Sequence, residues 1–205
     1  MYLKTTPLLL RALLPSNLEW KIKTTGKEIF LTFDDGPIPE ITSWVLDQLD
    51  KYEAKATFFC VGDNVRKHPD IFAEIGLRGH AVGNHSFHHV QAWKTSFDNY
   101  MHDVILCNEL VNSKLYRPPH GQITPRLARA LGKDYRLIMW SILSRDFDRK
   151  MSGVNCLKSS LDNTSPGSIV VFHDSIKAWD RLEFTLPRFL EHFKDKGYTF
   201  IPIST

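Results

Sequence analysis

Short apolar runs alternate along the chain with longer segments in which apolar residues recur at helical spacing. The runs are nearly continuous and rich in β-branched and aromatic residues, which is typical of parallel strands buried on both faces. They lie at 28–33, 56–61, 80–83, 115–117, 136–140, 168–172 and 198–203. The pattern therefore predicts about seven parallel strands.

Helical periodicity fills the intervals between these runs. In the first interval, for example, Ile41, Val45, Leu46 and Leu49 fall on one helical face. The predicted helices span 39–52, 63–77, 96–112, 124–132, 154–163 and 181–196. Strands that alternate with helices in this way predict an α/β fold.

Prolines and glycines mark the expected ends of these helices. Pro125 stands near a helix start, where its missing N–H is harmless. Gly79, Gly132 and Gly197 stand near helix ends, where left-handed caps are common. Either a small (β/α) barrel or an open doubly wound sheet fits this order of elements. Because an eight-stranded barrel typically has about 250 residues, a barrel in this chain would be trimmed and distorted.

Composition narrows the class of protein. The chain has 205 residues, 42% hydrophobic and 24% charged, which predicts a single globular domain and excludes a disordered or fibrous chain. The net charge of +3 gives no reason to expect nucleic acid as a partner. The three cysteines, Cys60, Cys107 and Cys156, are too widely spaced for a zinc knuckle and are expected to be buried thiols. Trp44 and Trp140 are expected in the core.

The N-terminal residues 1–27 are interpreted as a short lead-in to a domain core at 28–203. No run reaches the roughly 18 apolar residues of a transmembrane helix. Within 1–14, Arg11 interrupts the apolar stretch and no small-residue cleavage site follows, unlike a secretory signal. We expect this stretch to be an amphipathic segment that packs on the domain, and we expect a cytoplasmic protein.

Chemically reactive residues gather where the predicted strands end. Carboxylates, imidazoles and a guanidinium follow five of the apolar runs at their C-terminal side. These residues are Asp34, Asp35, His85, His89, Arg117, Asp146 and His173. In a barrel such ends meet on one face, where active sites lie, and an open sheet would place them along one edge. Five groups in this position indicate a catalytic site rather than packing.

Each group also has a simpler interpretation when taken alone. The sequence Asp34-Asp35-Gly36-Pro37 has the residues of a turn, yet two adjacent carboxylates repel each other unless a cation relieves one of them. His85 and His89 are spaced i, i+4, as in a metal site with an open position. A plain histidine cluster, or a pair made by His85 and His88, stays open as an alternative.

The stretch 117–121 predicts a rigid loop that presents its backbone. Two prolines restrict φ, and Gly121 lets the backbone approach a ligand closely. Its remaining N–H groups could face an oxyanion, although an ordinary proline loop is the alternative. His173 could likewise be a core histidine, so the joint occurrence of the groups carries the argument.

At these residues the sequence resembles the polysaccharide deacetylase family, the NodB homology domain of carbohydrate esterase family four. The family pattern is T-F-D-D-G-P, H-[ST]-x-x-H, R-x-P-x-G, D-x-x-D-W and L-x-H, in that order. The first three motifs match in full at 32–37, 85–89 and 117–121. The fourth keeps Asp146 but has Leu143 for the first Asp and Phe147 for the Trp. The fifth keeps His173 with Val171 for the Leu.

The resemblance implies a distorted (β/α) barrel and a metal-dependent hydrolase that removes N-acetyl groups from a sugar polymer, oligomer or precursor. It implies one divalent metal, commonly zinc, on Asp35, His85 and His89, although cobalt, nickel or manganese would also suit these ligands. It implies Asp34 as general base held near Arg117, and His173 as general acid tuned by Asp146. The substrate-binding residues are then Pro119, His120, Gly121, Phe147 and Val171.

The departures at 143, 147 and 171 leave the metal, base and acid untouched, so we expect activity with an altered substrate preference. Three alternatives stay open: an O-acetyl esterase acting on a glycan, a non-catalytic carbohydrate-binding relative, and an unrelated metallohydrolase such as a phosphoesterase. The phosphoesterase would need more ligands for two metals. The sequence does not predict which glycan is the substrate, nor the oligomeric state.

Overall fold

The structure is a computed structural model and describes residues 15–204. Its strands are β1 (Leu18–Glu19), β2 (Glu28–Asp34), β3 (Thr57–Cys60), β4 (Ala81–Asn84), β5 (Leu115–Tyr116), β6 (Arg136–Ile138), β7 (Ile142–Leu143), β8 (Ile169–His173) and β9 (Thr199–Phe200). Its helices are α2 (Ile41–Lys51), α3 (Gly62–Lys67), α4 (Pro69–Leu77), α5 (Phe97–Val111), α6 (Pro125–Leu131), α7 (Gly153–Leu161) and α8 (Trp179–Asp195), with a 3₁₀ turn η1 (Pro119–Gly121).

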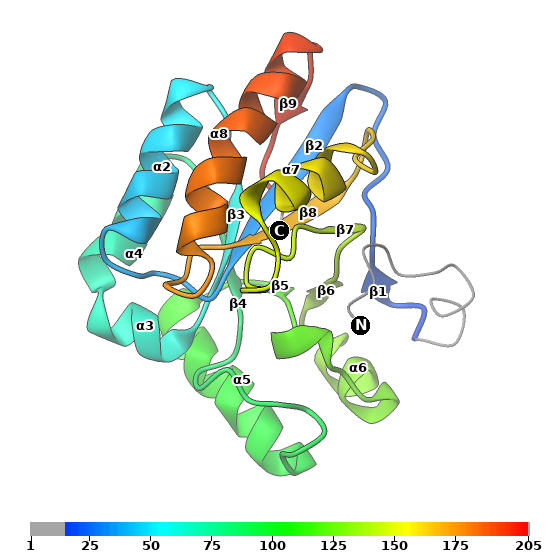
Figure 1. Cartoon of the computed structure of the whole chain (residues 1–205). Helices are drawn as coiled ribbons and strands as arrows, with labels where there is room; N and C mark the ends of the chain where they lie inside the picture. The colour runs from blue at the N-terminus through cyan, green and yellow to red at the C-terminus, as the bar shows by residue number, and fades with distance from the viewer. Residues whose placement is uncertain (1–14, 205) are drawn as a thin grey trace.

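The strands form one curled, parallel sheet, which confirms the trimmed and distorted barrel (Figure 1). Their order is β1-β6-β5-β4-β3-β2-β8-β7, and β9 pairs with the start of β2. Among the described residues no ladder joins β7 to β1, so the barrel stays open between these two short strands. Helices α2, α4 and α8 pack side by side outside β2 and β3 (Figure 1).

Alternation along β2 separates the core from the site. Ile29, Leu31 and Phe33 belong to the core cluster beneath α2 and α8 and are fully buried. Phe30 belongs to a second cluster inside the sheet. Successive side chains of a strand point to opposite faces, so Thr32 and Asp34 lie on the same inner side as Phe30. β2 therefore directs Ile29, Leu31 and Phe33 outward beneath the helices, and Phe30, Thr32 and Asp34 toward the barrel interior.

Strand register then brings the reactive ends together. Asp34 at the end of β2 pairs with His173 at the end of β8 and with Phe59 in β3. Asn84, just before His85, pairs with Tyr116, just before Arg117. The predicted convergence of strand ends on one face is therefore confirmed.

The structure also corrects several expectations. Nine strands occur within 15–204 rather than about seven, because β1 and β7 are two-residue strands too short to give a pattern. The predicted helix at 63–77 is two helices, since the chain bends at His68 before Pro69. Gly79 and Gly197 have positive φ, but Gly132 caps α6 with φ −68° and is not left-handed.

Two further expectations concern the cysteines and the N-terminal segment. All three thiols are free and buried, as predicted, and burial raises their pKa values above the usual range. The amphipathic segment predicted at 1–14 lies outside the described residues. Residues 15–27 of the lead-in contribute β1, and Lys21 forms a bridge with Ser168. Within 15–204, no helix is long and apolar enough to cross a membrane, and the compartment stays a prediction.

Candidate active site

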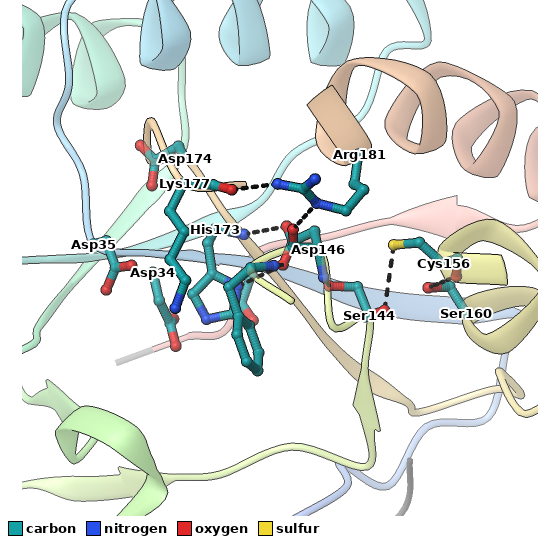
Figure 2. A network of polar contacts seen from close by, with 12 residues as sticks. Asp34, Asp35, Ser144, Asp146, Cys156, Ser160, His173, Asp174, Lys177 and Arg181 are labelled. Carbon is teal, nitrogen blue, oxygen red and sulfur yellow. Dashed lines mark hydrogen bonds and ion pairs between the residues drawn. The ribbon is translucent and has the colours of Figure 1, made fainter. Parts of the chain in front are cut away.

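A cavity of about 450 Å³ opens at the C-terminal ends of the strands. Its polar wall is formed by residues from four connections. They are Asp34, Asp35, His85, His89, Gln91, His120, Gln122, His173 and Lys177. Figure 2 shows Asp34, Asp35 and His173 side by side at the ends of β2 and β8. The structure thus places the predicted base, metal ligands and acid around one space.

Asp34 and Arg117 form an ion pair beneath the cavity. The Arg117 Nη1 group donates to Asp34 Oδ1 at 2.6 Å, and Arg117 is 0% and Asp34 only 4% exposed. Arg117 also donates to Thr32 Oγ1 and to the carbonyls of Ile138 and Met139. These contacts fix the guanidinium from β2 and β6, so Asp34 is held in one orientation.

Asp35, His85 and His89 bring three ligand atoms together. Their candidate ligand atoms all lie within 4.8 Å of one another, and within 15–204 they are the one such group of metal-binding side chains. Asp35 Oδ1 lies 3.3 Å from His89 Nε2 and 3.9 Å from His85 Nε2. Burial opposes ionisation of Asp35, but the histidines around it outweigh burial and lower its pKa.

The tautomer of His85 suits a metal ligand. Its Nδ1 lies 2.8 Å from the carbonyl oxygen of Arg117, which can only accept, so Nδ1 carries the proton. The Nε2 lone pair is then left facing Asp35 and His89. Burial lowers the pKa of His85 to about 4, which keeps the ring neutral at pH 7.

The loop of residues 85–89, the histidine loop, is held in place by hydrogen bonds to Asp103 on α5. Its carboxylate accepts from the N–H groups of Phe87 and His88 at 2.9 and 3.0 Å, and its Oδ1 lies 2.6 Å from His88 Nδ1. His88 therefore turns away from the cavity and is mostly exposed. The spacing i, i+4 rather than i, i+3 brings the two imidazoles toward Asp35.

His173 and Asp146 form the second charged pair. His173 Nδ1 lies 2.7 Å from Asp146 Oδ1, and the His173 N–H donates to Asp146 Oδ2 at 2.7 Å. Asp146 is 0% exposed. Burial disfavours the imidazolium, but the Asp146 carboxylate outweighs burial and raises the pKa of His173 to about 9. His173 is therefore protonated at neutral pH.

The proline loop forms the opposite wall. His120 has φ 58° and packs edge-on against His89, with ring centroids 4.4 Å apart. Gly121 lines the cavity with φ 66°, and a Cβ there would lie 2.4 Å from the Trp140 ring. Pro119, which was predicted to contact the substrate, is buried inside the loop and does not line the cavity.

Apolar side chains complete the cavity. They are Trp140, Leu143, Phe147 and Val171. Phe147 packs edge-on against His173 with centroids 5.0 Å apart. Trp140 is only partly buried and lines the cavity, so its assignment to the core was incomplete, because an apolar run does not distinguish a strand end at a site from one in the core.

Backbone conformation sets this face apart from the rest of the molecule. Within residues 15–204, eight non-glycine residues have positive φ, and five of them lie in the loops around the cavity: Asp35, Ser86, His89, His120 and Arg145. Such conformations are costly for residues with a Cβ and persist where the surrounding structure enforces them. Their concentration here supports a functional site.

Comparison with known proteins identifies the family. The family model described as polysaccharide deacetylase matches residues 21–136, more than half of the chain. The chain belongs to the polysaccharide deacetylase family. The predicted family, and with it the predicted class of enzyme, is thereby confirmed.

Two peptidoglycan-N-acetylglucosamine deacetylases of Bacillus cereus are similar to this family member. One is 32% identical over 191 residues, which is 86% of this chain and 66% of the relative, just under two thirds. The other is 31% identical over 192 residues, which is 90% of each. A crystal structure of a peptidoglycan N-acetylglucosamine deacetylase with a naphthalenyl N-hydroxybenzamide superposes with a TM-score of 0.83, 30% identity and 91% coverage of both chains.

Several residues of this polysaccharide deacetylase domain were not found from sequence. Gln91, Gln122 and Lys177 line the cavity but lie in loops without a motif. Asp174, next to His173, accepts from the Gly36 N–H at 3.0 Å and from Thr42 Oγ1 at 2.7 Å. Asp174 directly follows β8, so its position at a strand end would have indicated it, whereas Lys177 lies further along the same connection.

Proposed function

We propose that this protein hydrolyses N-acetyl groups on an N-acetylated glycan and releases acetate and a free amine. The observation that supports this best is the meeting of Asp34, the Asp35-His85-His89 group and His173 around one cavity. Amide hydrolysis needs an activated water, a stabilised oxyanion and a proton for the leaving amine. The cavity offers a group for each of these needs.

The three ligand residues fit a divalent metal. Two neutral imidazoles and one carboxylate with an open position are typical of catalytic zinc, and the proton on His85 Nδ1 leaves Nε2 free to ligate. Zinc is therefore our first choice, and cobalt, nickel or manganese would also suit these donors. When bound, the metal supplies Lewis acidity toward a water and a carbonyl oxygen.

Asp34 serves as the general base in this proposal. Asp34 lines the cavity and immediately precedes the metal ligand Asp35 in the sequence. Its carboxylate is held by an ion pair with the fixed guanidinium of Arg117. Arg117 does not line the cavity and acts through Asp34. The fixed carboxylate takes the proton of the attacking water, a role worth typically 10²–10⁴-fold in rate.

His173 serves as the general acid. With a pKa of about 9 it carries its proton at neutral pH and can donate it to the departing amine. Its Nδ1 is held by the buried Asp146, which leaves Nε2 as the donating atom. Asp146 thus positions the imidazole and favours its protonated form.

The loop at 117–121 supplies the oxyanion contact. Pro118 and Pro119 have no N–H, and the N–H groups of Gly121 and Gln122 donate to Pro118 and Pro119 within the turn. The His120 N–H is the one left in this turn for a developing oxyanion. Phe147 and Val171 then contact the sugar and the acyl methyl group from the other side.

An assay with paired substrates tests this function. Zinc-loaded protein is given N-acetylglucosamine oligomers and an acetylated aryl ester, and acetate release is measured for each. We expect turnover of the oligomers. Turnover of the ester alone would indicate an O-acetyl esterase. No turnover of either at full metal occupancy would favour a non-catalytic glycan-binding relative.

A further inference from the structure

We propose that Lys177 makes this site selective for N-acetylated glycans that carry a carboxylate close to the reacting acetamide. The inference rests on the proposed function and adds the charge of the substrate to it. Lys177 lies in the connection between β8 and α8 and lines the cavity. Nothing in the catalytic scheme above uses its ammonium group.

Lys177 differs from the other ionised groups of the site because it has no acidic partner. Asp34 is paired with Arg117, Asp146 with His173, and Asp35 with His85 and His89. Among the residues from 15 to 204, no carboxylate lies within 4.0 Å of the Lys177 ammonium. The ammonium lies over the ring of Phe147, whose centroid is 5.4 Å away. The Lys177 ammonium is therefore an exposed positive charge on the cavity wall with no ion-pair partner among these residues.

The backbone of Lys177 is held in place. Arg181 Nε donates to the carbonyl of Asp146 at 2.5 Å, and Arg181 Nη2 donates to the carbonyl of Lys177. Arg181 is only 8% exposed and so links the connection after β7 with the one after β8. Figure 2 shows the Lys177 side chain directed to the same side as Asp34 and the ring of His173. The Lys177 side chain thus extends from a fixed backbone position toward the reacting groups.

A carboxylate suits this environment better than a neutral hydroxyl. An ammonium is a strongly hydrated point charge, so removing its water costs free energy. A carboxylate of the ligand offsets this cost by an ion pair, whereas a neutral hydroxyl offsets little of it. A single ammonium matches a single negative charge, whereas a phosphate dianion would leave one charge unmatched. For a partly solvated pair we expect a contribution of about 10-fold in affinity, or about 1.4 kcal/mol.

The test uses two glycans that differ in one charge. The first is a peptide-free oligosaccharide of alternating N-acetylglucosamine and N-acetylmuramic acid with free lactyl carboxylates, and the second is its methyl ester. For the wild-type protein we expect kcat/KM to be about 10-fold higher on the free acid, and this ratio should shrink as salt is raised. Lys177→Met should bring the ratio to about one.

Lys158→Met is the matched control, because Lys158 is an exposed lysine on α7 that does not line the cavity. It should keep the wild-type ratio. No preference in the wild type, or an equal loss on both glycans in Lys177→Met, would overturn the proposal.

Calorimetric binding of the same two glycans separates this inference from the proposed function. If no acetate is released from any glycan, the proposed function fails. The ratio of the two dissociation constants, in the wild type and in Lys177→Met, still decides the role of Lys177. A ratio near 10 that Lys177→Met abolishes supports the proposal, and equal constants in the wild type refute it.

Discussion

Replacing Arg117 with methionine should destabilise the fold by about 3–5 kcal/mol, because it leaves a buried carboxylate without its partner. Methionine fills much of the same volume but cannot donate. Asp34 would lose its 2.6 Å ion pair while staying 4% exposed. An exposed ion pair, by contrast, contributes only about 0–1 kcal/mol.

The contacts of Arg117 support a value inside this range. Its guanidinium also donates to Thr32 Oγ1 at 2.7 Å, to the Met139 carbonyl at 2.9 Å and to the Ile138 carbonyl at 3.2 Å. A buried acceptor that loses its donor costs about 1–3 kcal/mol. The losses are not additive, because the strand ends can relax and water can enter from the cavity. We therefore expect about 4 kcal/mol.

Urea unfolding followed by circular dichroism measures this loss. With a slope of about 2 kcal/mol per M, the midpoint should fall by about 2 M while the slope stays the same. The double variant Asp34→Asn/Arg117→Met should lose at least about 1 kcal/mol less than the two single variants together, since no charge is left unpaired. A loss below about 1 kcal/mol for Arg117→Met, or simple additivity, would refute the reasoning.

Three further predictions concern the acid, its stabilisation and the metal ligands. Because the pKa of His173 is raised to about 9, its protonated form stabilises the fold fully below about pH 6.5, and this stability is lost as pH rises through about 9. The free energy of unfolding of the wild type, measured relative to that of His173→Gln, should therefore decline over this range. A difference that stays constant between pH 6 and 10 would contradict the prediction. Asp146→Asn should move the alkaline limit of kcat/KM to lower pH by at least one unit, and an unmoved limit would show that Asp146 does not tune the acid. Asp174→Asn should weaken zinc binding about 10–100-fold in a chelator competition, because Asp174 accepts a hydrogen bond from the Gly36 N–H and so fixes the backbone next to Asp35. Unchanged zinc affinity would show that Asp174 contributes only to folding.

Periodicity predicted the architecture because most strands and helices are long enough to carry a pattern. The runs at 28–33 and 168–172 became β2 and β8, and the helical spacing at 39–52 became α2. The two-residue strands β1 and β7 were missed because a ladder this short depends on its neighbours and not on its own residues. The break between α3 and α4 was missed because apolar residues continue at helical spacing across Pro69.

The site was predictable wherever a side chain follows a strand directly. Asp34 and His173 end β2 and β8, His85 and Arg117 directly follow β4 and β5, and the parallel register brings the four together. Asp103 could not be found in this way, because it lies in the middle of α5 and reaches the histidine loop only after the helix packs.

The roles of Lys177 and Trp140 depend on the shape of the cavity. Their places on its wall follow from how loops and side chains from several strands pack together. A one-dimensional pattern does not contain that information, so both residues required the structure.

Acetate release from N-acetylglucosamine oligomers, compared between metal-stripped and zinc-reconstituted protein, tests the central claim most directly. Asp34→Asn, brought to the same zinc content, serves as the control for the base. We predict turnover only with zinc, and a loss of about 10²–10⁴-fold in Asp34→Asn. Turnover that survives removal of the metal, or that Asp34→Asn leaves unchanged, would contradict the assignment of Asp34 as base beside a metal held by Asp35, His85 and His89.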